Sequence, residues 1–187
     1  LTNNPSNTVK SEPIRQHAIR DMQTSTHVSD EKKEELGIIF PGMRDHHILN
    51  IYRDLRNKLL RISDYQNFVC VLSSLSPDGD TAKLSMNLAA VFAFDKSRSS
   101  IVIECDTNHS LIEKLSTQES DNGLIDFIEN DLDDISILIQ ESGIERLRIV
   151  PAGNVIETST ESLESIRMRE IVTELKKRYP DRYIFIN

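Results

Sequence analysis

Residues 73–83 read SSLSPDGDTAK and lie between an apolar run, NFVCVL, and a stretch of helical character, LSMNLAAVFAF. A strand, a tight turn containing proline and glycine, and a helix form the layout of a phosphate-binding loop. In such a loop the backbone N–H groups converge on the phosphates, and the amino terminus of the helix adds about half a positive charge. The residues expected to contact a nucleotide are Pro77, Asp78, Gly79, Asp80, Thr81 and Ala82.

The position after the glycine, where a phosphate-binding loop carries a lysine, is occupied by Asp80. A carboxylate there repels an anion: two unit charges about 4 Å apart interact by about 4 kcal/mol at an effective dielectric constant near 20. Lys83 lies about one helical turn further on and is expected to point elsewhere. The structural alternative is that Asp80 or Asp78 caps the helix, since aspartate is favoured there. The loop is therefore expected to bind nucleotide weakly or not at all.

Two carboxylates, Glu104 and Asp106, end the second apolar run, SIVIECD. The carboxyl end of a parallel strand is where α/β proteins hold magnesium or orient water, and strand alternation directs both side chains to the same side. Together with the hydroxyl of Thr81 they form a candidate magnesium site, and solvated acids at a strand end are the alternative. The last run, YIFIN, ends in Asn187, whose amide oxygen can ligate a metal but supplies no charge.

Apolar patterns predict the elements that position these residues. A helix is expected from Asp45 to Ile62, with Arg53 and Arg56 on or beside its polar side. Its apolar face is predicted to comprise Ile48, Ile51, Tyr52, Leu55, Leu59 and Ile62. Buried strands at 67–72, 100–105, in RLRIVPAG and in YIFIN alternate with helices at 81–94 and 161–179. This alternation predicts an α/β fold, a mostly parallel sheet with helices on both faces and with the 67–72 strand central.

Composition limits the class of protein. The chain has 187 residues, of which 38% are apolar and 28% charged, as expected for one soluble α/β domain. Residues 1–34 are polar and lack periodicity, so we expect a flexible tail followed by a domain over 35–187. A formal charge of −8 argues against nucleic acid as a partner. No apolar run reaches the ~18 residues that span a bilayer, and Cys70 and Cys105 are expected to be buried thiols, so a cytoplasmic location is expected.

Seven segments follow one another along the chain: IYRDLRNKLL, SSLSPDGDTAKLSMNLAAVFA, IVIECD, NGLIDFIEN, RLRIVPAG, ESLESIRMREIVTEL and RYPDRYIFIN. In this order they resemble the cytoplasmic P-loop ATPases and tyrosine autokinases of bacterial exopolysaccharide synthesis, relatives of the chromosome-partitioning ATPases. The resemblance covers most of 36–187. It implies a P-loop NTPase-like fold, a Mg-ATP site at the loop, and an oligomer or partner surface at Arg53 and Arg56. It also implies a membrane polysaccharide co-polymerase or glycosyltransferase as partner, recruiting the domain to the inner face of the membrane.

The chain departs from the family pattern at several positions. Asp80 replaces the loop lysine, Asn187 the final acid, and Asn50 the glutamate that precedes the two arginines, and the tyrosine-rich tail of the autokinases does not occur. The leading hypothesis is thus a degenerate, regulatory member with no certain cofactor. An active, Mg-ATP-binding ATPase or protein-tyrosine kinase is the alternative, and a partitioning-type ATPase is a third. The final apolar strand also suggests a fragment or an unusual sheet edge.

Overall fold

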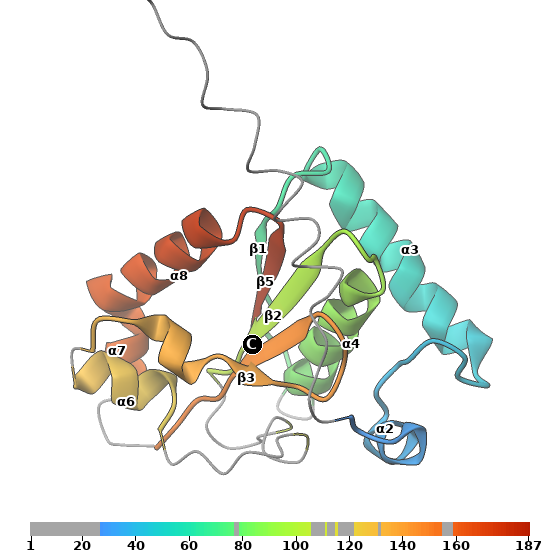
Figure 1. Cartoon of the computed structure of the whole chain (residues 1–187), viewed down its shortest axis with the longest axis horizontal. Coiled ribbons are helices and arrows are strands. Elements are labelled where there is room, and N and C mark those ends of the chain that lie inside the picture. The colour runs from blue at the N-terminus through green and yellow to red at the C-terminus, as the bar shows by residue number, and fades with distance from the viewer. Residues whose placement is uncertain are drawn as a thin grey trace, which may run out of the picture.

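The computed structural model describes residues 27–76, 79–105, 111, 115, 122–130, 132–154 and 159–187. Their strands form one five-stranded sheet in the order β1-β5-β2-β4-β3, in which every neighbouring pair is parallel except β3 and β4 (Figure 1). The prediction of a mostly parallel α/β sheet is confirmed. The strands are β1 (Val69–Val71), β2 (Ser99–Ile103), β3 (Gln140–Glu141), β4 (Leu147–Val150) and β5 (Arg182–Ile186).

The predicted central position of the 67–72 strand is wrong. Within the described residues β1 pairs only with β5 and forms an edge of the sheet, with Val71 71% exposed. The central strand is β2, whose five residues are all buried between β5 and β4. An apolar run indicates that a strand has little polar surface, but it carries no information about which strand will lie beside it. The last strand in the chain inserts between the first two, which local pattern could not reveal.

Helices cover both faces of the sheet (Figure 1). Alternate strand residues separate into two apolar layers, so that Val102 and Phe185 belong to one and Ile103 and Ile184 to the other. The first layer packs against α3 (His46–Ile62) and α4 (Thr81–Ala93). The second packs against α6 (Leu124–Glu129), the 3-10 helix η1 (Ile135–Leu138), α7 (Ser159–Glu164) and α8 (Ile166–Arg178). No helix in the described part of the chain is long and apolar enough to cross a membrane.

The two long predicted helices differ in how well the pattern located them. The helix expected over 45–62 is α3, with Asp45 as its N-cap. Its predicted apolar face is partly wrong, because Ile48, Ile51 and Ile62 are exposed and the buried residue is Leu49. Apolar residues surround more than half of this helix, so spacing alone could not select the packed side. The single helix expected over 161–179 is instead α7 followed by α8, because the side chain of Ser165 caps the start of α8.

The structured part begins earlier than the predicted boundary after residue 34. Helix α2 (Asp30–Leu36) starts within the expected tail, and its ends are capped by the Ser29 side chain and by Gly37 in the left-handed conformation. The backbone N–H of Val28 also donates to the Gly143 carbonyl at 3.3 Å. Helix α2 has no buried residue, so it offered no apolar periodicity to detect. Residues 1–26 of the expected tail lie outside the described residues, and the tail itself stays a prediction.

One buried side chain joins this amino-terminal segment to the domain. Asn87, in the middle of α4, accepts a hydrogen bond from the backbone N–H of Ile39 at 2.8 Å. Its Nδ2 donates to the Gly37 carbonyl at 2.9 Å and to the Tyr52 hydroxyl at 3.3 Å. The amide therefore satisfies two main-chain groups of a segment that enters the core at Ile38 and Ile39. This contact holds the amino-terminal segment and α3 against the helix that follows the loop.

Candidate functional site

The loop between β1 and α4 directs its hydrogen-bond donors inward. The backbone N–H of Gly79 donates to the Ser76 carbonyl at 3.0 Å, and that of Thr81 donates to the Gly79 carbonyl at 3.1 Å. Ser74 accepts from the Ser76 N–H at 3.0 Å and donates to the Ser76 carbonyl at 2.5 Å. Pro77 and Asp78 lie outside the described residues. Two N–H groups that would face a phosphate in an open loop are thus bonded to the loop's own carbonyls.

Asp80 caps α4, as the structural alternative proposed. Its Oδ1 accepts a hydrogen bond from the backbone N–H of Lys83 at 2.8 Å, and its Oδ2 lies 3.1 Å from the Lys83 ammonium. Lys83 therefore folds back onto Asp80, and its Cε lies 3.3 Å from where a Cβ on Gly37 would be. The carboxylate occupies the helix amino terminus where an anion would bind, while Lys83 offsets part of its charge.

The other two loop residues have different surroundings. Thr81 is the first residue of α4 and is partly exposed, so its hydroxyl can reach solvent near the loop. Ala82, in the first turn of α4, is buried in the apolar layer that contains α3 and α4, so it has a packing role. The described part of this loop therefore presents a capping carboxylate and two internally bonded N–H groups, and its weak binding of a nucleotide stays a prediction.

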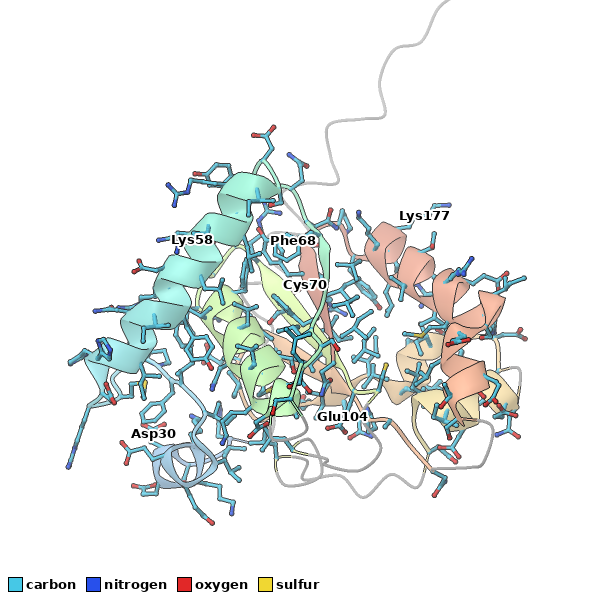
Figure 2. All side chains as sticks on the ribbon, turned by 180° about the vertical axis from the view of Figure 1, so that it is seen from behind. Asp30, Lys58, Phe68, Cys70, Glu104 and Lys177 are labelled. Carbon is cyan, nitrogen blue, oxygen red and sulfur yellow. The ribbon has the colours of Figure 1, made fainter. Side chains whose placement is uncertain are left out.

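Glu104 lies at the carboxyl end of β2, which is the end of the sheet that faces the loop (Figure 2). It is 1% exposed, and its backbone N–H donates to Val150 in β4 at 2.9 Å. Burial, and then the charge of Glu104, raise the pKa of the neighbouring Cys105 to about 12, so this thiol is protonated at neutral pH. Both cysteines are free thiols, as predicted, but the prediction that they are buried is wrong, because each is only partly buried.

Asn187 is held beside the end of β2. The backbone N–H of Cys105 donates to the Asn187 carbonyl at 2.9 Å, and the Asn187 N–H donates to the Ile103 carbonyl at 3.3 Å. Both polar atoms of the Asn187 side chain are buried, with no hydrogen-bond partner among the described residues. The structure thus brings the carboxyl ends of β2 and β5 together, a neighbourhood that the sequence analysis had not predicted.

The predicted magnesium set of Thr81, Glu104 and Asp106 stays a prediction, because Asp106 lies outside the described residues. Among the residues that are described, no group of three or more His, Cys, Asp or Glu side chains is arranged to hold a metal ion. Of this set, the structure describes the buried carboxylate of Glu104 at the end of β2 and the hydroxyl of Thr81 at the start of α4. Both lie at the carboxyl end of the parallel strands.

The two arginines of α3 have separate environments. Arg53 is exposed, and its Nη1 lies 3.5 Å from the side-chain oxygen of Asn50. Arg56 is partly buried, and its Nη1 donates to the Val91 carbonyl in α4 at 3.1 Å. Arg56 thereby joins two helices of one layer, and Arg53 is the member of the pair that is available to a partner. A partner surface containing both residues stays a prediction.

A polar contact that the sequence analysis missed lies beyond the carboxyl end of β4. The carboxylate of Asp126 in α6 accepts from the N–H of Gly123 at 2.8 Å, from the N–H of Asn154 at 3.0 Å and from Asn154 Nδ2 at 2.9 Å. A Cβ on Gly123 would lie 2.2 Å from the Gly153 nitrogen, so the two glycines allow the chain segments to approach. Gly-x-x-Asp at the start of an apolar run was the available signal, since Asp126 at the third helical position can accept from the N-cap N–H, which is one half of a capping box.

Replacing Asp126 with asparagine should lower the free energy of unfolding by about 2 kcal/mol, the range for hydrogen bonds to a charged group. Burial raises the pKa of Asp126, but the hydrogen bonds from Asn154 and Gly123 outweigh it and hold that pKa below its ordinary value. A lowered pKa stabilises the fold above pH ~4, and this stability is lost as the pH falls further, through the folded-state pKa.

Urea titrations at pH 7 and at pH 3 would measure both effects. The difference between wild type and D126N should shrink at pH 3, and the exposed Asp133→Asn should serve as a neutral control. Equal stability of D126N and wild type at pH 7 would contradict a role for this contact.

No protein-family model matches the sequence, and the search of curated proteins gave no match. Solved structures do match. The kinase domain of the Escherichia coli tyrosine kinase ETK superposes with a TM-score of 0.63 at 23% identity, over 72% of this chain and 52% of that one. The VpsO kinase domain superposes with a TM-score of 0.59 at 21% identity, over 71% of this chain and 64% of that one. The BceF tyrosine kinase domain superposes with a TM-score of 0.65 at 21% identity, over 94% of this chain and 74% of that one.

The chain spans little more than half of the ETK kinase domain. Identities below 25% establish the fold, and they leave activity to be argued from the residues of this chain. The resemblance noted in the sequence is confirmed at this level: the chain has the P-loop α/β fold of the bacterial tyrosine kinase domains.

Proposed function

We propose that this domain acts in bacterial exopolysaccharide synthesis as a degenerate relative of the tyrosine autokinases, regulating a membrane partner through protein contacts. The fold shared with tyrosine kinase domains supports the general class. The order of the sequence motifs supports the link to exopolysaccharide synthesis. The state of the loop supports the regulatory role, because the groups that would bind phosphate are already used within the protein.

The observation that carries the proposal is the cap on α4. A phosphate at the helix amino terminus would meet the Asp80 carboxylate and would have to displace its bond to the Lys83 N–H. At about 4 Å and an effective dielectric constant near 20, the repulsion is about 4 kcal/mol before screening by Lys83 and solvent. The internal bonds of Gly79 and Thr81 would also have to break. A tightly bound nucleotide is not compatible with this arrangement.

A titration of the purified protein with ATP, in the presence and absence of Mg²⁺, tests the proposal by calorimetry. We expect no binding tighter than a Kd of about 1 mM, and no transfer of γ-phosphate to tyrosine in a radiolabel assay. Binding in the micromolar range, dependent on Mg²⁺, together with phosphotyrosine formation, would overturn it.

That second result would support the alternative, an active Mg-ATP-binding ATPase or protein-tyrosine kinase. One observation favours this alternative: Glu104, a buried carboxylate at the strand end beside the loop, is the type of group that holds a magnesium ion. In that case Thr81, Glu104 and Asp106 would hold the metal, whose role is to neutralise phosphate charge.

The expected partner is a membrane polysaccharide co-polymerase or a glycosyltransferase, which would bring the domain to the inner face of the membrane. Arg53, on the exposed side of α3, offers a cationic group for this contact or for a homo-oligomer. Arg53→Glu should abolish a two-hybrid interaction with the cytoplasmic segment of the co-polymerase. Arg169→Glu, a matched exposed arginine on α8, should leave it intact. Loss in both variants, or in neither, would contradict this surface.

A further inference from the structure

A buried arginine at the other end of the sheet has unused hydrogen-bonding capacity. Arg182, the first residue of β5, is 6% exposed. Its Nε donates to Ser99 Oγ at 3.3 Å, and its Cζ lies 3.9 Å from the centre of the Tyr179 ring. Its Nη1 is buried and has no hydrogen-bond partner among the described residues. Leaving a charged N–H group buried without an acceptor costs free energy, which a bound anion would recover.

A second arginine lies on the same face of the sheet. The register places Arg182 beside Ser99 and Arg148 beside Ile101, so both arginines flank β2. Alternation puts them on the α8 side of the sheet with Ile184 and Val150. The Arg148 side chain is 13% exposed, and its Nη2 lies 4.0 Å from the Glu141 carboxylate, at the limit of an ion pair.

The electrostatics of this pair are consistent with a missing anion. Burial lowers the pKa of both guanidinium groups, and the charge of Arg148 lowers the pKa of Arg182 further. The charge of Asp181 raises the pKa of Arg182, and the charge of Glu141 raises the pKa of Arg148. The side chain of Arg182 nevertheless donates only to Ser99 among the described residues. Arg148 already donates to the Leu147 carbonyl at 3.3 Å, whereas Arg182 keeps a buried N–H group without an acceptor among the described residues. Two positive charges thus lie on one face of the sheet, and that of Arg182 is incompletely compensated.

The geometry points to an oxyanion site formed by Arg182, Arg148 and Ser99 at the amino ends of β2, β4 and β5, with a phosphate or carboxylate group as its ligand. A guanidinium plane presents parallel N–H donors that match such groups, and the Tyr179 ring fixes the plane of Arg182. Ser99 Oγ accepts from Arg182, so its own proton can be donated to the ligand. Lys177, in the last turn of α8, lies on the exposed surface at this end of the molecule (Figure 2).

This site is separate from the phosphate loop. The loop follows the carboxyl end of β1, whereas Arg182 and Ser99 are the first residues of their strands. Strands β1, β5 and β2 are parallel, so the two sites lie at opposite ends of the sheet. An anion could bind here whatever happens at Asp80.

A direct test follows the side-chain Nε–Hε resonance of Arg182 by ¹⁵N NMR while sodium phosphate replaces sodium chloride at constant ionic strength. We expect saturable shifts with a Kd on the order of 1 mM. A parallel titration with sodium acetate identifies which of the two oxyanion classes binds more tightly. Arg148→Gln should weaken binding at least tenfold while leaving the Arg182 reporter in place, and Ser99→Ala should weaken it less. Lys177→Gln, on the nearby surface, should change the Kd less than twofold.

Saturable phosphate or acetate shifts that disappear in R148Q support the site. Shifts that are linear in concentration, that occur equally with chloride, or that are lost equally in R148Q and K177Q would overturn it, since the anion would then bind only to the general surface potential. If R148Q does not fold, Ser99→Ala takes its place, because it removes the Ser99 hydroxyl donor and leaves the charges of Arg148 and Arg182. Binding that S99A weakens no more than K177Q does would then overturn the site.

Discussion

Replacing Asn87 with leucine should lower the free energy of unfolding by about 3 kcal/mol or more. The change leaves the Ile39 N–H and the Gly37 carbonyl without their partner in a region where Ile38 and Ile39 are fully buried. Each buried polar group left unsatisfied costs about 1–3 kcal/mol, and leucine regains only part of that through apolar contact. A domain stable by about 5–15 kcal/mol would be severely weakened, which urea denaturation followed by circular dichroism would measure.

Two matched variants sharpen this test. Asn87→Asp keeps an acceptor for the Ile39 N–H but loses the donor to Gly37 and Tyr52, so it should be at least as destabilising above pH ~5. Asn57→Leu, at an exposed position of α3, should change stability by less than about 0.5 kcal/mol. If N87L and N57L lose similar stability, the Asn87 contact is not what holds the amino-terminal segment.

The affinity for Mg-ATP should rise at least tenfold when Asp80 is replaced by lysine. The change removes a carboxylate from the helix amino terminus, frees Lys83 from its ion pair and adds a cation where phosphate would bind. Even a screened part of the roughly 4 kcal/mol repulsion exceeds the ~1.4 kcal/mol that corresponds to tenfold in affinity. Hydrolysis should stay poor, since Asn187 cannot act as an acid or base. Calorimetric titration with Mg-ATP measures the change.

Asp80→Asn separates charge from capping. Asparagine is as good an N-cap as aspartate, so D80N should keep the stability of α4, and any gain in affinity would come from the lost charge alone. D80K should lose about 1 kcal/mol of stability with the cap. If neither variant binds Mg-ATP more tightly than wild type, the internal bonds of Gly79 and Thr81 keep the loop closed. The domain would then have to work entirely through its surfaces.

Local pattern determined much of this protein. Short apolar runs alternating with helical stretches were sufficient for an α/β fold with a mostly parallel sheet, because buried parallel strands need no polar alternation. The helix caps were equally local. Asp45 and Asp80 begin their helices because an aspartate side chain can accept from the backbone N–H two or three residues further along.

Contacts between distant residues were decided only by the tertiary structure. The order of the strands placed β5 between β1 and β2, and packing selected Leu49 over Ile48 and Ile51 as the buried side of α3. Asn87 reaches Gly37 and Asp126 reaches Asn154 across long stretches of chain. Arg182 and Arg148 share one face only because β2 lies between their strands. Spacing along a sequence reports which side of its own element a residue occupies, whereas neighbours across elements depend on how the whole core is packed.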